Sequence, residues 1–193
     1  QKEARRRTAF EELFFMQAGI LLLRKKRQSH VMGIKCAPSG QLVRSVLRQF
    51  PFTLTEGQKQ AFTDIENDME GLVPMQRLIQ GDVGSGKTAV AALALAKVVE
   101  NGYQGALMAP TEVLAGQHYR TFQEFYKGLP IHVAYLSGQT KTKERNEILK
   151  GLKEGSIDVL IGTHALIEED VVFAHLGLVI TDEQHRFGVK QRK

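Results

Sequence analysis

Apolar residues recur along the chain in two patterns, and the change from one to the other near Thr55 divides the sequence into two regions. Residues 8 to about 28 carry a broad apolar face at helical spacing. Basic residues at 24–27 suit the carboxyl end of such a helix, where the helix dipole favours positive charge. Residues 29–40, with two glycines and a proline, predict a linker, and a short helix is expected over residues 41–49.

From Thr55 onward the pattern predicts alternating helices and strands. Helices are expected at 56–70, 88–101, 111–126 and 141–152, and strands at 77–80, 106–109, 131–136, 157–161 and 178–181. The runs 158–161 and 178–180 are apolar at consecutive positions, which is typical of strands buried on both faces. Short strands separated by helices predict right-handed crossovers and a parallel sheet, and therefore an α/β fold.

Charge is unevenly distributed between the two regions. Residues 1–50 hold eleven Lys or Arg and three Asp or Glu, a net charge of +8. Residues 51–193 hold fifteen Lys or Arg and eighteen acids, a net charge of −3. We expect a basic helical linker or extension at 1–50 and an α/β domain at 51–193. The basic part is either a nucleic-acid-binding surface or a solvated helix surface, and charge alone does not decide between them.

Two classes of protein are disfavoured by composition. The longest apolar stretch, residues 19–23, is far shorter than the roughly 20 residues that a membrane span needs, so we expect no membrane partner. Cys36, the sole cysteine, cannot form an internal disulfide, and a thiolate metal site would need more thiols. A reducing, cytoplasmic location fits this composition.

A glycine-rich run supplies the strongest chemical signal. The eight residues Gly81, Asp82, Val83, Gly84, Ser85, Gly86, Lys87 and Thr88 fit the phosphate-binding P-loop pattern. Glycines let backbone amides approach phosphate oxygens, and the amino end of the following helix adds free amides and a positive dipole end. Lys87 supplies a full positive charge for the β- and γ-phosphates, and Thr88 offers a hydroxyl to Mg²⁺. The prediction is an ATP site.

An acidic pair follows the last predicted strand. At the carboxyl edge of a parallel sheet, Asp182 and Glu183 would face the ligand crevice. We predict that Asp182 holds Mg²⁺, directly or through water, and that Glu183 acts as the general base that polarises the attacking water.

Together with the P-loop, the run Asp182-Glu-Gln-His resembles the DEAD/DEAH box of superfamily 2 helicases. This resemblance implies a RecA-like P-loop NTPase domain with ATP and Mg²⁺ as cofactors. Residues 52–58 resemble the segment that reads adenine in that superfamily, with Gln58 pairing with the base and Phe52 stacking on it. The resemblance also makes Gln184 and His185 couplers between the ATP site and a second RecA-like domain.

Three further segments resemble superfamily motifs Ia, Ib and Ic, at 109–118, 136–138 and 161–166. In that superfamily these loops hold a nucleic-acid strand by its phosphates, which small residues and hydroxyls near helix starts can do. The DNA-binding residues carried over are Pro110, Thr111, Gln117, Gly138, Gly162 and Thr163. Without the resemblance, each loop would be an ordinary strand-to-helix connection.

The motif sequences at 80–88, 161–167 and 182–192 resemble those of the RecG-type DNA helicases. The resemblance extends over nearly the whole chain. That resemblance implies the remodelling of branched DNA, such as stalled forks and Holliday junctions, by pulling on duplex. The transcription-repair coupling translocases share much of the pattern and are the alternative within the same class. A nucleic-acid-binding module without turnover is the alternative from a different class, although it would be free to lose Lys87 and Asp182.

The chain begins with Gln1 rather than Met and stops just after the acidic box. We therefore expect a piece of a longer protein, without the second RecA-like domain and its arginine finger. Such a half-site is expected to bind nucleotide weakly, to hydrolyse it slowly and not to translocate. The remaining histidines do not have metal-ligand spacing and are expected to be structural or solvated: His118, His132, His164 and His175.

Overall fold

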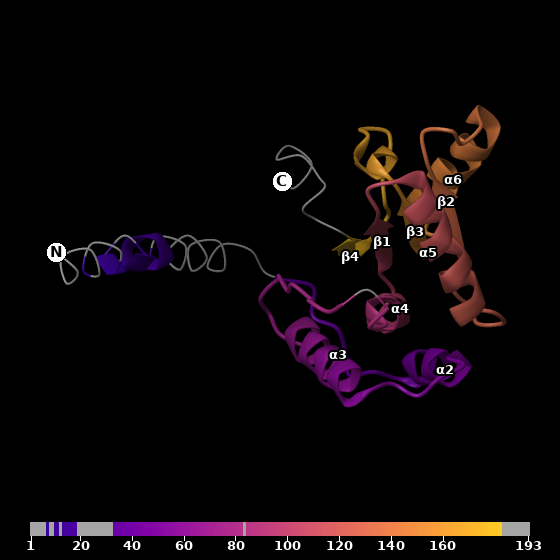
Figure 1. Cartoon of the computed structure of the whole chain (residues 1–193). Helices are drawn as coiled ribbons and strands as arrows, with labels where there is room; N and C mark the ends of the chain where they lie inside the picture. Colours follow the sequence, from indigo (N-terminus) through magenta and orange to yellow (C-terminus); the bar gives the residue numbers. More distant parts are fainter. Residues whose placement is uncertain (1–6, 8–9, 12, 19–32, 83, 183–193) are drawn as a thin grey trace.

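The computed structural model describes residues 7, 10–11, 13–18, 33–82 and 84–182. A parallel sheet of four strands forms the centre of the described part, and helices lie around it (Figure 1). The strands β1 (Gln104–Met108), β2 (Val133–Leu136), β3 (Val159–Gly162) and β4 (Leu176–Thr181) lie in the order β2-β3-β1-β4. All the pairs are parallel, so the carboxyl ends of the strands meet at one edge of the sheet. The predicted α/β fold is confirmed.

The helices agree with the sequence pattern to within two residues at either end. They are α2 (Gln41–Gln49), α3 (Glu56–Met69), α4 (Lys87–Glu100), α5 (Glu112–Phe125) and α6 (Thr142–Glu154), with a short 3₁₀ helix η1 (His164–Ile167) after β3. Two of these helices have a threonine at the N-cap: Thr55 caps α3 and Thr111 caps α5. Each accepts a hydrogen bond from an otherwise unpaired amide of the first turn.

Successive strand residues point to opposite faces of the sheet and bury two separate cores. Leu107 and Ile161 pack with α2, α4 and α5 on one face. Met108 and Leu160 pack with α6 and η1 on the other. Helix α4 is apolar nearly all round and is buried along most of its length. Burial of each fully enclosed leucine in these cores contributes about 1.5–3 kcal/mol relative to exposure.

Two predictions about strands are wrong. Residues 77–80 do not form a strand, because an apolar run also needs a hydrogen-bonded ladder, and Arg77 instead binds the α3 carboxylates of Asp64 and Asp68. The second error concerns β4, which we expected to be buried on both faces. Val179 is 55% exposed, because β4 pairs only with β1 in the described sheet and lies at its edge.

The amino-terminal region is described in part. Residues 10, 11 and 13–18 are helical, as predicted, and their phenylalanine side chains are exposed. The rest of the helix expected up to residue 28 lies outside the described residues. Residues 33–40 are irregular, as expected of a linker, and α2 packs on α4 through Val43 and Val46. The division at residue 50 stays a prediction. Among the described residues, no helix is both long and apolar enough to cross a bilayer.

Candidate functional site

The glycine-rich loop turns sharply just before α4. Gly84 has φ of 84° and Gly86 has φ of 77°, a left-handed conformation that glycine adopts without strain. A Cβ atom on Gly86 would also collide with the side-chain amide of Gln58. The amide of Ser85 donates to the carbonyl of Asp82 at 3.1 Å and closes the turn. Val83 lies outside the described residues.

The amino end of α4 is suited to an anion. Gly86 provides no side-chain cap, and the first turn of the helix contains no acidic residue. The first-turn amides and the positive end of the dipole therefore keep their electrostatic preference for negative charge. A phosphate group is the usual ligand of such a terminus when a glycine-rich loop precedes it.

Lys87 curls back over the loop that precedes it. Its ammonium group donates to the carbonyl oxygens of Gly81 at 2.7 Å and Asp82 at 2.9 Å. Among the ion pairs between described residues, none involves Lys87. Neutral carbonyl partners are weaker ligands for an ammonium than charged oxygens, so a phosphate could replace them.

Gln58 has two structural contacts that the sequence did not indicate. Its side-chain oxygen accepts from the amide of Thr55 at 2.8 Å and completes a capping box at the start of α3. Its side-chain nitrogen donates to the carbonyl of Ser85 at 2.8 Å. Gln58 therefore ties α3 to the phosphate loop. That Gln58 also binds adenine stays a prediction. Its side-chain amide has a second N–H and a second oxygen lone pair that could bind the base.

Phe52, the predicted stacking partner of adenine, lies against two other rings. It stacks on Phe50 with ring centroids 5.3 Å apart and meets Phe125 edge-on at 6.3 Å. It remains 45% exposed. Stacking on adenine is a prediction that these contacts neither require nor exclude.

The phosphate loop and Asp182 lie at the same edge of the sheet. A Cβ atom added to Gly177, near the start of β4, would lie 3.2 Å from the side chain of Val98, near the end of α4. Helix α4 connects to β1 through a turn of only three residues, so it runs antiparallel to the strands. Its amino end, with Lys87, is therefore at the carboxyl edge, where Asp182 follows β4. The amide of Asp182 donates to the carbonyl of Met108 and extends the ladder to this point.

The carboxylate of Asp182 contacts a histidine that the sequence did not assign to the site. His118 Nε2 lies 2.7 Å from Asp182 Oδ2. Their side chains are 16% and 32% exposed. A single histidine on a helix gives no signal of a partner 64 residues away, so the sequence predicts only a structural or solvated role for His118.

The donor atoms at this edge suit magnesium. Mg²⁺ prefers oxygen ligands and usually binds one or two carboxylates together with substrate phosphates and water. Asp182 supplies a carboxylate, and Thr88 stands in the first turn of α4 beside Lys87. No group of three or more metal-ligating side chains occurs within the described part of the chain. The predicted partners Glu183, Gln184 and His185 lie outside the described residues.

Most of the predicted DNA-binding residues lie at the same edge, in the connections that follow β1, β2 and β3. Gly138 and Gln117 are exposed. The hydroxyl of Thr111 accepts from the amide of Leu114 at 3.3 Å and caps α5. Pro110 is half-buried. Because β2, β3 and β1 are parallel neighbours, these connections lie at the same edge of the sheet.

The end of β3 and the connection that follows it are different, since Gly162 and Thr163 are buried. A Cβ atom at Gly162 would collide with the carbonyl of Leu136, so only glycine fits there. Thr163 is 2% exposed, and its hydroxyl oxygen has no hydrogen-bond partner among the described residues. A buried hydroxyl without a partner is uncommon. Contact between Thr163 and DNA stays a prediction, and it requires movement of this connection.

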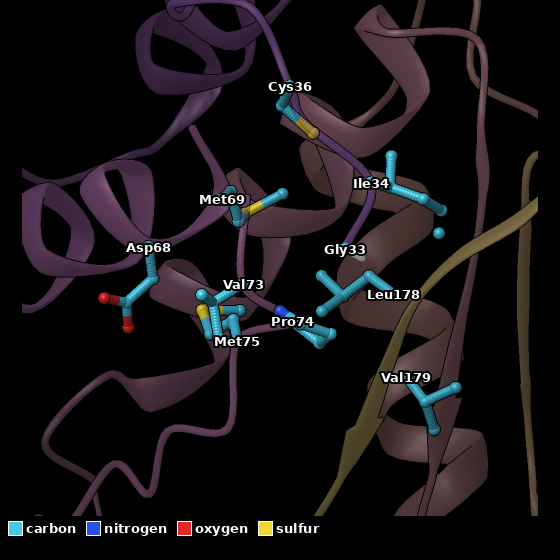
Figure 2. A pocket seen from close by; sticks show the side chains of 11 residues that line it. Gly33, Ile34, Cys36, Asp68, Met69, Val73, Pro74, Met75, Leu178 and Val179 are labelled. Carbon is cyan, nitrogen blue, oxygen red and sulfur yellow. The ribbon is translucent and has the colours of Figure 1, made fainter. Parts of the chain in front are cut away.

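A hollow of about 380 Å³ lies at the other end of β4 (Figure 2). It is bordered by residues 33, 34 and 36, the end of α3, residues 73–75 and residues 177–179 of β4. Most of the residues that line it are apolar, and Asp68 there is paired with Arg77. This hollow is therefore not suited to a triphosphate.

Comparison with known proteins agrees with the geometry. The model of the DEAD/DEAH box helicase family matches residues 55–193. The chain is 53% identical over 192 residues to the ATP-dependent DNA helicase RecG of Thermotoga maritima. That match covers 100% of this chain and 24% of the Thermotoga protein. The chain is 47% identical to the RecG of Bacillus subtilis, again over 100% of this chain and 28% of that protein.

A solved structure of RecG bound to a three-way DNA junction superimposes with a TM-score of 0.88 at 51% identity. The match covers 97% of this chain and 26% of that one. The chain thus spans about a quarter of the length of the relatives that it matches. The chain belongs to the DEAD/DEAH box helicase family, and within that family it is similar to the RecG helicases.

Proposed function

We propose that this chain is the ATP-binding motor domain of a DNA translocase that remodels branched DNA. The observation that supports this most directly is the chain direction of α4 and β4, which puts the uncapped amino end of α4 and the residue after β4, Asp182, at the carboxyl edge of the sheet. The names of the relatives supply the substrate class, because several are ATP-dependent DNA helicases and one was solved on a three-way junction. The transcription-repair alternative is not favoured by these relatives.

In this proposal each residue has a defined task. The loop amides and Lys87 bind the phosphates, and Lys87 exchanges the carbonyls of Gly81 and Asp82 for phosphate oxygens. Thr88 and Asp182 hold Mg²⁺, which when bound neutralises charge on the phosphates. Glu183 orients and deprotonates the attacking water, and Gln184 and His185 pass the state of the site to a second RecA-like domain.

The DNA strand is proposed to lie along the border formed by the connections after β1, β2 and β3. In this proposal the exposed residues Gln117, in α5, and Gly138, after β2, bind phosphate oxygens. A binding module without nucleotide turnover would not need the uncapped, acid-free helix start at Lys87. A cytoplasmic location also stays a proposal, based on the single thiol.

The experiment is a titration of a fluorescent ATP analogue into the chain and into its Lys87→Ala variant, with and without Mg²⁺. Loss of the charged donor should weaken binding by about 10- to 100-fold, since a hydrogen bond to a charged group contributes about 1.5–3 kcal/mol. Lys153→Ala, at an exposed position on α6, is the matched control. Equal affinity in wild type and Lys87→Ala would overturn the assignment of the site.

A further inference from the structure

His118 and Asp182 come from distant parts of the sequence and meet at the edge of the sheet. The ring nitrogen Nε2 lies 2.7 Å from the carboxylate oxygen Oδ2. An ionised carboxylate can only accept hydrogen bonds, so with Asp182 ionised the donor in this contact is the Nε2–H group of His118. The histidine side chain is 16% exposed, which limits competition from water.

The helix that carries His118 is firmly anchored. Thr111 caps the amino end of α5, and Ala115 and Phe122 on the same helix are fully buried. Residues next to each other on a helix point about 100° apart. Gln117 is therefore exposed in a different direction from His118, which contacts Asp182.

From this geometry we propose that His118 is a positioning residue that orients the Asp182 carboxylate for Mg²⁺. The inference rests on the proposed function, since it assumes that Asp182 holds the metal of a bound nucleotide. Carboxylates that bind metals are commonly held by hydrogen bonds of their own, and loss of such a partner typically costs 10- to 100-fold in metal affinity. A carboxylate has about four lone-pair positions, so a hydrogen bond from His118 is compatible with metal binding.

A second histidine–aspartate contact in the same chain provides a matched control. His132 Nδ1 lies 3.3 Å from Asp158 Oδ2, and the His132 side chain is 75% exposed. Asp158 precedes β3, so this contact lies at the amino edge of the sheet, opposite the phosphate loop. Removal of the His132 ring changes a similar pair without touching the proposed metal ligand.

The experiment measures Mg²⁺ affinity directly, by titrating Mg²⁺ into the chain in the presence of the fluorescent ATP analogue. His118→Ala should weaken apparent Mg²⁺ affinity about tenfold or more. His132→Ala should leave it unchanged. His118→Gln places an amide donor near the position of Nε2 and should restore most of the affinity. Nucleotide affinity in EDTA should be the same in all four proteins.

A double variant separates positioning from structural support. In the Asp182→Asn background, His118→Ala should have no additional effect on Mg²⁺ affinity, because the carboxylate it positions is gone. If His118→Ala weakens binding equally in EDTA, lowers the thermal midpoint and is not restored by glutamine, the residue is structural and the proposal is overturned. Unchanged Mg²⁺ affinity in His118→Ala also overturns it, while Lys87 dependence of nucleotide binding would leave the proposed function standing. If the wild type binds no nucleotide, both proposals fail.

Discussion

Helix α4 carries one lysine at its amino end and another near its carboxyl end, and the two lysines have opposite environments. Lys87 at the amino end is partly exposed and donates to main-chain carbonyls of the phosphate loop. Lys97 near the carboxyl end is 0% exposed and binds the Glu70 carboxylate at 2.7 Å. Its ammonium group also donates to the carbonyl of Ala37.

The contrast shows how one helix serves both binding and stability. Around Lys97 the charges are already compensated, and Glu100 and Asn101 nearby hold the backbone of residues 37–42 against α4. Around Lys87 the positive charge has only neutral partners among the described residues. A cation with neutral partners can exchange them for an anionic ligand, whereas one in a buried ion pair loses more by leaving it.

The largest expected effect tests the carboxyl end. Lys97→Met should lower the free energy of unfolding by about 3 kcal/mol, because it leaves the Glu70 carboxylate without its cation. Glu70 is partly exposed, which keeps the effect near the lower end of the range for broken buried pairs. Denaturant unfolding measures it. Lys153→Met on α6 should change stability by less than about 0.5 kcal/mol, and Lys87→Met should behave likewise. Equal losses of unfolding free energy in Lys87→Met and Lys97→Met would contradict the proposed difference between the two lysines.

An intermediate effect is expected at the turn before α4. Gly86→Ala should destabilise the chain by about 1–2 kcal/mol, because φ of 77° is unfavourable for a residue with a Cβ atom. The added methyl also displaces the Gln58 amide, so nucleotide affinity should fall as well. Gly116→Ala, inside α5 where an added Cβ atom would meet the Arg120 side chain at an ordinary 4.0 Å, should instead stabilise by about 0.5–1 kcal/mol. Unchanged stability in Gly86→Ala would show that a side chain at this position does not strain the turn.

The smallest effect concerns the middle of α4. The hydroxyl of Tyr126 donates to the carbonyl of Ala92 at 2.7 Å, and Tyr126→Phe should cost about 1 kcal/mol at neutral pH. Burial raises the pKa of Tyr126 well above its usual value. Above pH ~10 the unfolded chain loses this proton while the folded chain keeps it, so wild-type stability should fall as pH rises.

The phenylalanine variant should lose that part of the alkaline destabilisation. Urea unfolding at neutral pH and above pH ~10 measures both effects. Tyr103→Phe is the control for removing a hydroxyl elsewhere. An identical pH dependence in wild type and Tyr126→Phe would show that Tyr126 does not contribute to it.

Local pattern was sufficient for the helices and for the phosphate loop. The period of apolar residues sets the bounds of α2 to α6, and the glycine spacing identified the turn at Gly84 and Gly86. It was not sufficient at residues 77–80, where an apolar run lacks a neighbouring strand and Arg77 binds α3 instead. Strand formation depends on a partner that is distant in sequence, whereas helix bonds are local.

The sequence by itself determined the order of helices and most strands, the phosphate loop and the acid that follows the last strand. Tertiary structure alone decided that His118 meets Asp182, that Gln58 binds the loop, and that Lys97 is buried while Lys87 is not. These contacts join residues 27 to 64 positions apart, or depend on what packs around one helix. Period and motif describe neighbours along the chain, so they cannot specify which distant side chains the folded sheet brings together.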